Sequence, residues 1–212
     1  MDFKEDRAVI KACFFDIGNV LIFVDFKQLL DNFSKLFSTN KFKLFLFLEK
    51  HDIRNRIEKG LLSEDEALVI FNRTFQTTTS FDAFKKAMCG CFEKNAAIEP
   101  IVNDLRQNHK LYLLSNTSPT HFEYLYSHFP ILHCFDDKIL SYEVQLMKPD
   151  ERMYTHAIKL ACVQPHEILY IDDIKPFCKA AKKQQICVHH FQSTHALEKD
   201  LTTLNLLPIK KT

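Results

Sequence analysis

The sequence has few glycines, no CxxC pair, no long apolar run and no excess of charge of either sign. No window reaches the roughly 18 uninterrupted apolar residues that a membrane-crossing helix needs, so no membrane partner is expected. The charged start MDFKEDRAVI is unlike the apolar stretch of a signal peptide, and we therefore expect a cytoplasmic protein. The 28 basic and 27 acidic residues nearly cancel, which excludes the broad basic field of a nucleic-acid-binding protein.

The seven cysteines are an odd number and are scattered along the chain, with only Cys89 and Cys91 close together. This pattern favours free buried thiols over disulfides or a zinc site. The composition, 46% hydrophobic and 26% charged, is typical of a globular protein, and 212 residues suffice for one medium domain that carries a smaller insert. The sequence does not indicate the oligomeric state.

Four short segments are continuously hydrophobic, as strands buried on both faces of a parallel sheet are. The last three are separated by segments with helical periodicity, which is the rhythm of an α/β fold. The expected strands are 11–16 (KACFFD), 110–115 (KLYLLS), 167–172 (EILYID) and 185–191 (QICVHHF), and the expected helices are 98–108, 118–129, 150–162, 174–185 and 193–207. We therefore predict an α/β fold with a Rossmann-like parallel-sheet core.

The stretch between the first strand and the rest has a different, helical rhythm. Its first part carries apolar residues at the spacing of one helical face: Phe26, Leu29, Leu30, Phe33, Leu36 and Phe37. Ser63 and Glu66 form a capping-box pattern shortly after Gly60. The predicted organisation is a core domain of residues 1–24 and 95–212 with an inserted α-helical cap domain of residues 25–94.

Polar residues follow the apolar runs, at the edge where ligands collect in open parallel sheets. Asp16 follows the first run, Ser115 and Asn116 the second, and Asp172 with Asp173 the third. Lys148, in QLMKPD, lies in the loop before the helix that leads into the third run. Together these residues offer a nucleophile or metal ligand, a hydroxyl, a cation and a second pair of acids.

This set of groups suits phosphoryl transfer. A phosphate ester repels an attacking carboxylate, so the site needs a divalent cation, and Mg²⁺ prefers hard oxygen ligands such as Asp16, Asp172 and Asp173. Lys148 and the Ser115 hydroxyl would hold the remaining phosphate oxygens as charge spreads over them. Asp16 would attack phosphorus to give an aspartyl-phosphate, which water then cleaves.

The order of the motifs FFDIGNVL, LYLLSNT, LMKPD and ILYIDD resembles the haloacid dehalogenase-like superfamily of hydrolases over about residues 10 to 190. Within it, the chain is similar to the α-D-glucose-1-phosphate phosphatase type, whose first motif also reads Asp-x-Gly-Asn-Val. The resemblance implies a Mg²⁺-dependent phosphatase for a small phosphorylated metabolite. It implies the following roles: Asp16 as nucleophile, Lys148 as the residue that steadies the intermediate, Ser115 and Asn116 with Lys148 as phosphate ligands, and Asp16, the Gly18 carbonyl, Asp172 and Asp173 as metal ligands.

Three positions depart from the pattern that the resemblance implies. Gly18 stands where most phosphatases of the superfamily have the Asp that protonates the leaving group, Phe177 stands where relatives usually have Asn, and Gln145 where Gly is usual. Without that acid, departure is easier for a group that leaves well as an anion, which favours a sugar 1-phosphate. Asp25 is a candidate substitute acid, although the solvated start of a helix explains it equally well.

Two other hypotheses compete with the phosphatase. A binding or regulatory protein that kept the phosphate pocket but lost efficient turnover is favoured by Gly18 and Phe177 and opposed by the intact acids and Lys148. A dehalogenase is disfavoured by the retained acidic pair and by the lack of an aromatic residue at position 18. His189 and His190 are read as plain strand-end histidines, because neighbours on a strand point to opposite faces and do not form a metal pair.

Overall fold

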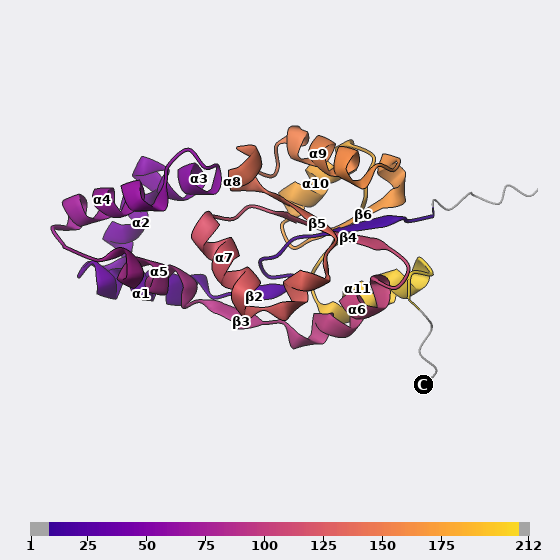
Figure 1. The fold of residues 1–212 in the computed structure, drawn as a ribbon, viewed down its shortest axis with the longest axis horizontal. Helices are drawn as coiled ribbons and strands as arrows, with labels where there is room; N and C mark the ends of the chain where they lie inside the picture. The colour runs from indigo at the N-terminus through magenta and orange to yellow at the C-terminus, as the bar shows by residue number, and fades with distance from the viewer. Residues whose placement is uncertain (1–8, 208–212) are drawn as a thin grey trace, which may run out of the picture.

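The computed structural model describes residues 9–207, and its centre is a five-stranded parallel sheet (Figure 1). The strand order is β5 (Asp137–Leu140), β4 (Lys110–Ser115), β1 (Ala12–Phe15), β6 (Ile168–Asp172) and β7 (Cys187–His190). The four strands predicted from continuous apolar runs are confirmed as β1, β4, β6 and β7. All four neighbouring pairs are parallel, so the carboxyl ends of the strands share one edge of the sheet.

Both faces of the sheet are covered, which explains why the central strands β1, β4 and β6 are apolar on both faces over most of their length. Cys13 and Phe15 of β1 pack in one cluster with helices α6 (Glu99–Leu105), α7 (Pro119–His128) and α11 (Thr194–Thr203). Ala12 and Phe14 pack on the opposite face with α9 (Glu151–Ala161) and α10 (Lys175–Lys183). In Figure 1, α9 and α10 lie above the sheet and α6 and α11 below it. The predicted Rossmann-like core is therefore confirmed.

The five core helices fall where the sequence predicts them, but each is shorter than predicted. The predicted N-cap of α9 is confirmed, since the Asp150 carboxylate accepts a hydrogen bond from the Arg152 N–H at 3.0 Å. Short elements complete the core: the 3₁₀ helices Ala96–Ile98, Pro130–Cys134 and Pro165–Glu167, and the single helical turn α8 (Ser141–Val144).

Edge strand β5 was not predicted. Its first two residues, Asp137 and Lys138, are exposed, and only Ile139 and Leu140 are buried. Two buried residues are too few to give an apolar run, so this strand is recognisable only from its pairing with β4.

The expectation of free, buried cysteines is correct for most positions. None of the seven cysteines, all of which lie within residues 9–207, forms a disulfide; Cys13, Cys89, Cys91 and Cys178 are buried. Cys162 departs from the prediction, because it ends helix α9 in a left-handed conformation and is exposed.

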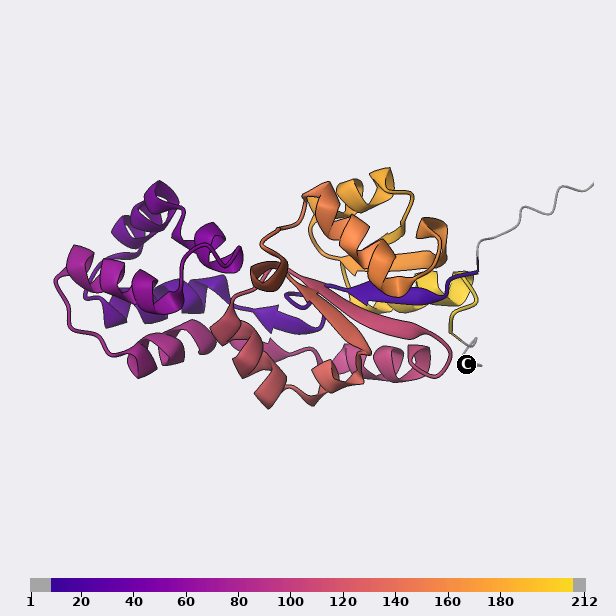
Figure 2. The same cartoon turned by 45° about the horizontal axis from the view of Figure 1, so that its top comes forward.

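Helices α1 (Phe26–Leu36), α2 (Lys41–His51), α3 (Ile53–Glu58), α4 (Glu64–Phe75) and α5 (Phe81–Cys89) form a unit at one end of the sheet (Figure 2). Their buried cluster is rich in phenylalanine: the rings of Phe37 and Phe71 stack at 4.7 Å, and those of Phe33 and Phe84 meet edge to face at 5.3 Å. The capping box at the start of α4 is confirmed. This unit therefore has a hydrophobic core separate from the two that flank the sheet.

Two short antiparallel strands, β2 (Ile22–Val24) and β3 (Phe92–Lys94), carry the chain out of the sheet core and back into it. Their pairing continues with a 2.8 Å hydrogen bond from the Asp25 N–H to the Cys91 carbonyl. The two connections to the helical unit therefore form one hydrogen-bonded ribbon, which Figure 2 shows between the two parts.

The helical unit also contacts the core beside the ribbon. The buried Glu64 carboxylate, at the start of α4, accepts hydrogen bonds from the N–H and the hydroxyl of Thr120, at the start of α7. A carboxylate is favourable there because the first N–H groups of a helix lack partners within the helix. Gly60, with φ +66°, packs so closely that an added Cβ would lie 2.6 Å from the Tyr142 carbonyl oxygen.

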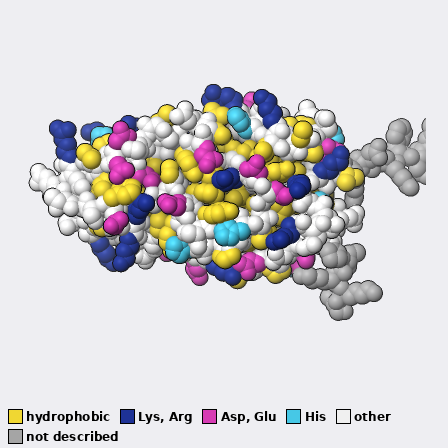
Figure 3. All heavy atoms as spheres, in the orientation of Figure 1, with side chains coloured by type: hydrophobic (Ala, Val, Ile, Leu, Met, Phe, Trp, Pro, Cys, Tyr) yellow, Lys and Arg dark blue, Asp and Glu magenta, His cyan; other side chains and the backbone are white. Residues whose placement is uncertain are grey.

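Charged side chains of both signs are interspersed over the face drawn in Figure 3, on the core and the helical unit alike. No large field of one sign covers that face. Within residues 9–207, no helix is long and apolar enough to cross a membrane.

Replacing Gly60 by Ala should destabilise the protein by at least about 1–2 kcal/mol, because a left-handed backbone disfavours any side chain and the added methyl would meet the Tyr142 carbonyl. Urea unfolding measures this change. Gly18→Ala is the control and should change stability much less, because its Cβ would meet only Val24 Cγ2, at an ordinary 3.6 Å. A Gly60→Ala protein as stable as wild type would contradict the close approach.

Candidate active site

Three carboxylates meet at the carboxyl edge of the sheet. Asp16 follows β1, Asp172 ends β6 and Asp173 comes directly after it, and one oxygen from each lies within 4.8 Å of the others. The neighbouring strands β1 and β6 hold them together, since the Asp16 N–H donates to the Ile171 carbonyl at 2.9 Å. Among the described residues, this is the one group of three or more Asp, Glu, His or Cys side chains with the spacing of a metal site.

A buried ammonium group lies among these acids. Lys148 is 2% exposed, and its Nζ is 2.9 Å from Asp16 Oδ1, 2.7 Å from Asp172 Oδ2 and 2.9 Å from the Leu114 carbonyl. The ring centroids of Phe177 and Tyr170 lie 5.2 and 5.7 Å from Nζ. Phe177, one of the three positions that depart from the pattern implied by the resemblance, thus packs against the cation.

Asp172 is held by groups from three segments. Its Oδ1 accepts the Ile174 N–H at 2.7 Å, while Oδ2 accepts both Lys148 Nζ and the Tyr170 hydroxyl. Sequence reasoning missed Tyr170 as a site residue because it was counted as part of an apolar strand. The available signal was its position two residues before Asp172, which places both side chains on the same face of β6.

Ser115 and Asn116 lie at the end of β4, beside the Lys148 loop. Ser115 is 2% exposed and sits between Leu114 and Asn116, both of which contact Lys148. The Asn116 side chain donates to the Lys148 carbonyl at 3.0 Å and accepts the Lys148 N–H at 2.8 Å. Asn116 therefore uses both its polar atoms to fix the Lys148 backbone.

The turn after Asp16 brings a further residue to the acids. Asn19, in a left-handed conformation with φ +54°, accepts the Val24 N–H at 3.1 Å through Oδ1. Its Nδ2 donates to Asp173 Oδ2 at 3.5 Å, and His190 Nε2 contacts the Asp173 carbonyl at 2.9 Å. Sequence reasoning did not assign Asn19 or His190 to the site. Gly18 lies in the same turn, and the space at its Cβ position is open enough for a side chain.

Other positions singled out in the sequence have plain structural partners. Asp25 is exposed and caps helix α1, accepting the Gln28 N–H at 2.9 Å. His189 Nδ1 lies 2.8 Å from Asp200 Oδ2. Gln145 has φ +55°, the region where glycine is at ease, which accounts for the glycine usual at this position.

One lysine faces three acids, and the pKa values of Asp16 and Asp173 are both raised. Burial raises the pKa of Asp16 to about 7, because the charges of Asp172 and Asp173 add to the desolvation and Lys148 only partly offsets it. Burial and Asp172 also raise the pKa of Asp173. Burial opposes the charge of Lys148, but Asp16 and Asp172 outweigh it and hold its pKa above the ordinary value. The site therefore favours an additional cation.

Comparison with known proteins finds the same family that the motifs resemble. A family model described as haloacid dehalogenase-like hydrolase matches residues 10–183. The chain is 27% identical over 172 residues to the D-ribitol-5-phosphate phosphatase of Bacteroides thetaiotaomicron, covering 78% of this chain and 84% of the relative.

Among solved structures, the chain is similar to a haloacid dehalogenase family enzyme from Bacteroides thetaiotaomicron, which was solved in complex with magnesium and inorganic phosphate. The TM-score is 0.76 and the sequence identity 26%, over 86% of this chain and 94% of the other. A hydrolase of the same type from Porphyromonas gingivalis has a TM-score of 0.80 at 22% identity, over 92% of this chain and 98% of the other, which supports the fold.

Replacing Lys148 by Met should destabilise the metal-free protein by about 3–5 kcal/mol at neutral pH, because it leaves Asp16 and Asp172 buried without their cation. The loss should shrink as the pH falls, since protonated carboxyl groups need no cation. Urea unfolding over a pH series in EDTA measures both effects.

The matched control for this variant is Lys110→Met, which removes an exposed ion pair with Asp136 at the other end of β4 and should change stability little. Equal losses of stability in Lys148→Met and Lys110→Met would show that the buried ion pairs of Lys148 stabilise the protein no more than the exposed pair of Lys110.

Proposed function

The chain belongs to the haloacid dehalogenase-like hydrolase family, and we propose that it is a Mg²⁺-dependent phosphatase that cleaves small phosphomonoesters through an aspartyl-phosphate on Asp16. The observation that carries this proposal is the group of three carboxylates within 4.8 Å of one another, with Lys148 bonded to two of them. The similarity to a D-ribitol-5-phosphate phosphatase and to a structure with magnesium and phosphate supports it.

The residues present fit a magnesium ion. The donors are hard carboxylate oxygens, as Mg²⁺ prefers, and burial, together with the neighbouring carboxylates, raises the pKa values of Asp16 and Asp173, so a second cation beside Lys148 would stabilise their charged forms. We assign Asp16, Asp172, Asp173 and the Gly18 carbonyl as its ligands. When bound, the ion supplies the positive charge that lets an anionic phosphate approach the Asp16 carboxylate.

Asp16 has one oxygen available for the chemistry. Its Oδ1 accepts the Ile17 N–H at 2.8 Å and pairs with Lys148, while no hydrogen bond within the described residues occupies Oδ2. Oδ2 attacks phosphorus, the bond from phosphorus to the alcohol oxygen breaks, and the alcohol leaves with the electron pair of that bond. Water then attacks the same phosphorus and breaks its bond to Asp16, which frees inorganic phosphate and restores the carboxylate.

Lys148 and Ser115 stabilise the charge that spreads over the phosphate oxygens. Lys148 Nζ is already 2.9 Å from Asp16 Oδ1, so its positive charge lies beside the reacting carboxylate and the lysine side chain need not move during the reaction. Ser115, buried at the end of β4, supplies a hydroxyl donor. Asn116 acts on phosphate through Lys148, whose backbone it holds on both sides.

Residues 25–94 act as a cap over this site in our proposal. One cavity of about 390 Å³ is lined from the helical unit by Asn55 and Lys59 and from the core by Lys148 and Arg152. Arg152 is paired with Asp150, which also lines this cavity, but together with Lys59 and Lys148 the lining keeps a net positive charge, which suits an anionic substrate. The substrate class is a small phosphorylated metabolite such as a sugar or polyol phosphate, and the lack of an acid at Gly18 favours alcohols that leave readily as anions.

Replacing Asp16 by Asn should lower kcat/KM for para-nitrophenyl phosphate by about 10³-fold or more, because the amide cannot form the phosphoryl intermediate. Activity of the wild type should also vanish in EDTA and return with Mg²⁺. Release of phosphate, with and without EDTA, measures both effects.

Asp136→Asn is the control for Asp16→Asn, because Asp136 lies at the opposite end of β4, and it should retain full activity. If the wild type releases no phosphate in an Asp16-dependent manner, the phosphatase proposal is wrong. The alternative, a binding or regulatory protein that lost efficient turnover, is then favoured.

Introducing Asp at position 18 should increase kcat/KM for alkyl phosphates by roughly tenfold, because it restores a proton donor for a poor leaving group, and should change para-nitrophenyl phosphate cleavage little. The backbone at Gly18 admits a side chain, since an added Cβ would meet only Val24 Cγ2 at 3.6 Å. Gly18→Asn, which has the same shape but no proton to give, is the control. Equal gains for Asp and Asn would contradict the missing-acid explanation.

A further inference from the structure

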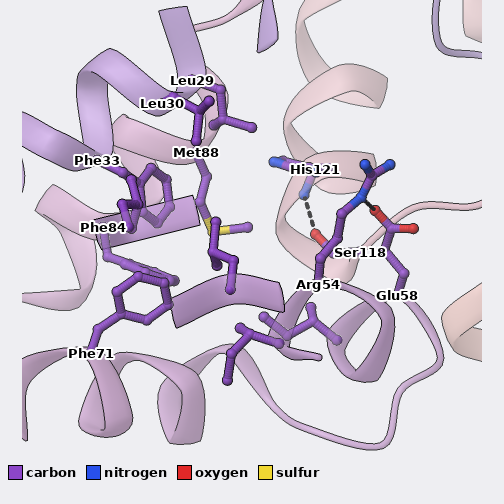
Figure 4. Close-up of a pocket in the computed structure, with 14 residues that line it drawn as sticks. Leu29, Leu30, Phe33, Arg54, Glu58, Phe71, Phe84, Met88, Ser118 and His121 are labelled. Carbon is purple, nitrogen blue, oxygen red and sulfur yellow. Dashed lines mark hydrogen bonds and ion pairs between the residues drawn. The ribbon is translucent and has the colours of Figure 1, made fainter. Parts of the chain in front are cut away.

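One cavity of the molecule lies apart from the candidate active site. It has a volume of about 110 Å³, lies between the helical unit and the start of α7, and is lined mostly by leucine, isoleucine and phenylalanine side chains (Figure 4). The charged pair beside it, Arg54 with Glu58, is bonded within α3 at 2.7 Å. No candidate catalytic, phosphate-binding or metal-binding residue lines this cavity. A further group that acts on the reaction must therefore lie closer to the carboxyl edge of the sheet.

At that edge, all the hydrogen-bond donors of Lys148 are in use. An ammonium group has three N–H donors and no acceptor. Lys148 Nζ has three acceptors: Asp16 Oδ1 at 2.9 Å, Asp172 Oδ2 at 2.7 Å and the Leu114 carbonyl at 2.9 Å. Lys148 can therefore donate to a phosphate oxygen, as the proposed function requires, only if one of these three acceptors loses or shares its N–H.

Asp172 Oδ2 has a second donor in place. The Tyr170 hydroxyl, which lies on the same face of β6, donates to this oxygen. The other oxygen of the carboxylate, Oδ1, accepts the Ile174 N–H at 2.7 Å. If Lys148 turns away, both oxygens of Asp172 still have a hydrogen-bond donor. The cost of leaving a buried charged group unpaired is thereby avoided.

The ring of Tyr170 is held firmly beside the lysine. Tyr170 is 1% exposed, and its ring meets that of Tyr154 edge to face at 5.7 Å. The Tyr154 hydroxyl in turn donates to the Phe177 carbonyl at 3.0 Å. The ring centroids of Tyr170 and Phe177 lie 5.7 and 5.2 Å from Lys148 Nζ. The Tyr170 hydroxyl is thus fixed at the oxygen that it shares with Lys148.

We propose that Tyr170 is a positioning residue for the phosphatase reaction, whose hydroxyl keeps Asp172 hydrogen-bonded while Lys148 turns one N–H from Asp172 Oδ2 to a phosphate oxygen. Nζ itself stays beside Asp16, because phosphorus bonds to this carboxylate and the positive charge is needed there. Tyr170 acts through Asp172 and Lys148 and does not contact the phosphate. The inference rests on the proposed function and adds a residue to which the motifs assign no role.

Replacing Tyr170 by Phe tests this role, because the ring and its packing remain and only the hydroxyl is lost. In the protein without phosphate, Lys148 still donates to Asp172 Oδ2, so the loss is felt mainly when phosphate is bound. The variant should lower kcat/KM for para-nitrophenyl phosphate by about tenfold or more, as expected for a hydrogen bond to a charged partner. It should weaken the binding of inorganic phosphate by a similar factor.

Steady-state kinetics measure the first effect, and calorimetric titration of inorganic phosphate into the protein in MgCl₂ measures the second. Urea unfolding gives the stability of each variant. Tyr112→Phe is the matched control, because Tyr112 is also buried on a central strand and stacks on Phe14 at 4.7 Å. Within the described residues its hydroxyl makes no hydrogen bond to Asp172 or Lys148, so this variant should keep the wild-type kcat/KM and phosphate affinity.

The two measurements separate this inference from the proposed function. If Tyr170→Phe lowers stability but keeps the phosphate affinity of the wild type, the role of Tyr170 is structural and the inference is overturned, whatever happens to kcat/KM. If the wild type binds phosphate but cleaves no ester, the phosphatase is wrong. Weaker phosphate binding by Tyr170→Phe, and not by Tyr112→Phe, then still supports the turn of Lys148. A wild type that binds no phosphate in MgCl₂ rejects both.

Discussion

The buried ammonium group of Lys148 is the constraint on which the carboxyl edge of the sheet depends. It contacts Asp16 after β1, Asp172 at the end of β6 and the Leu114 carbonyl in β4, so it ties together three adjacent strands. A buried lysine is costly unless every contact is made, and each contact requires the three strands to end at matching positions. The order β4-β1-β6 and the site at its edge are therefore aspects of one arrangement.

The described side chains at this edge of the sheet carry more negative than positive charge. Three carboxylates face one lysine, and burial, with the charges of Asp172 and Asp173, raises the pKa of Asp16 to about 7 despite the contact with Lys148. Filling the site with more internal cations would stabilise the fold but would leave nothing for a metal or a phosphate to bind. The uncompensated negative charge thus destabilises the metal-free fold, and such a cost in stability is common at binding sites.

Much of the core, and the meeting of most candidate site residues at one edge of the sheet, could be predicted from sequence because they depend on neighbours along the chain. Ser115 and Asp172 end buried strands and Asp16 directly follows one, and an apolar run followed by a polar residue can be recognised from the sequence alone. Tyr170 and Asn19 could not be recognised in this way, since each acquires its role from a partner brought close by folding. The same holds for the cavity of about 110 Å³ that Leu29, Leu30 and His121 line, because Leu29 and Leu30 have the spacing of an ordinary core face and only the packing of the surrounding helices leaves space beside them.

The ribbon of β2 and β3 has a consequence for how the chain assembles. Because Val24 pairs with Phe92, the two ends of the helical insertion are joined by hydrogen bonds where it leaves the core. To the rest of the chain, the insertion therefore resembles the loop of a long hairpin, and the entropic cost of closing such a loop grows only with the logarithm of its length. The entropic cost of bringing β1 and β4 together therefore depends only weakly on the number and lengths of the inserted helices.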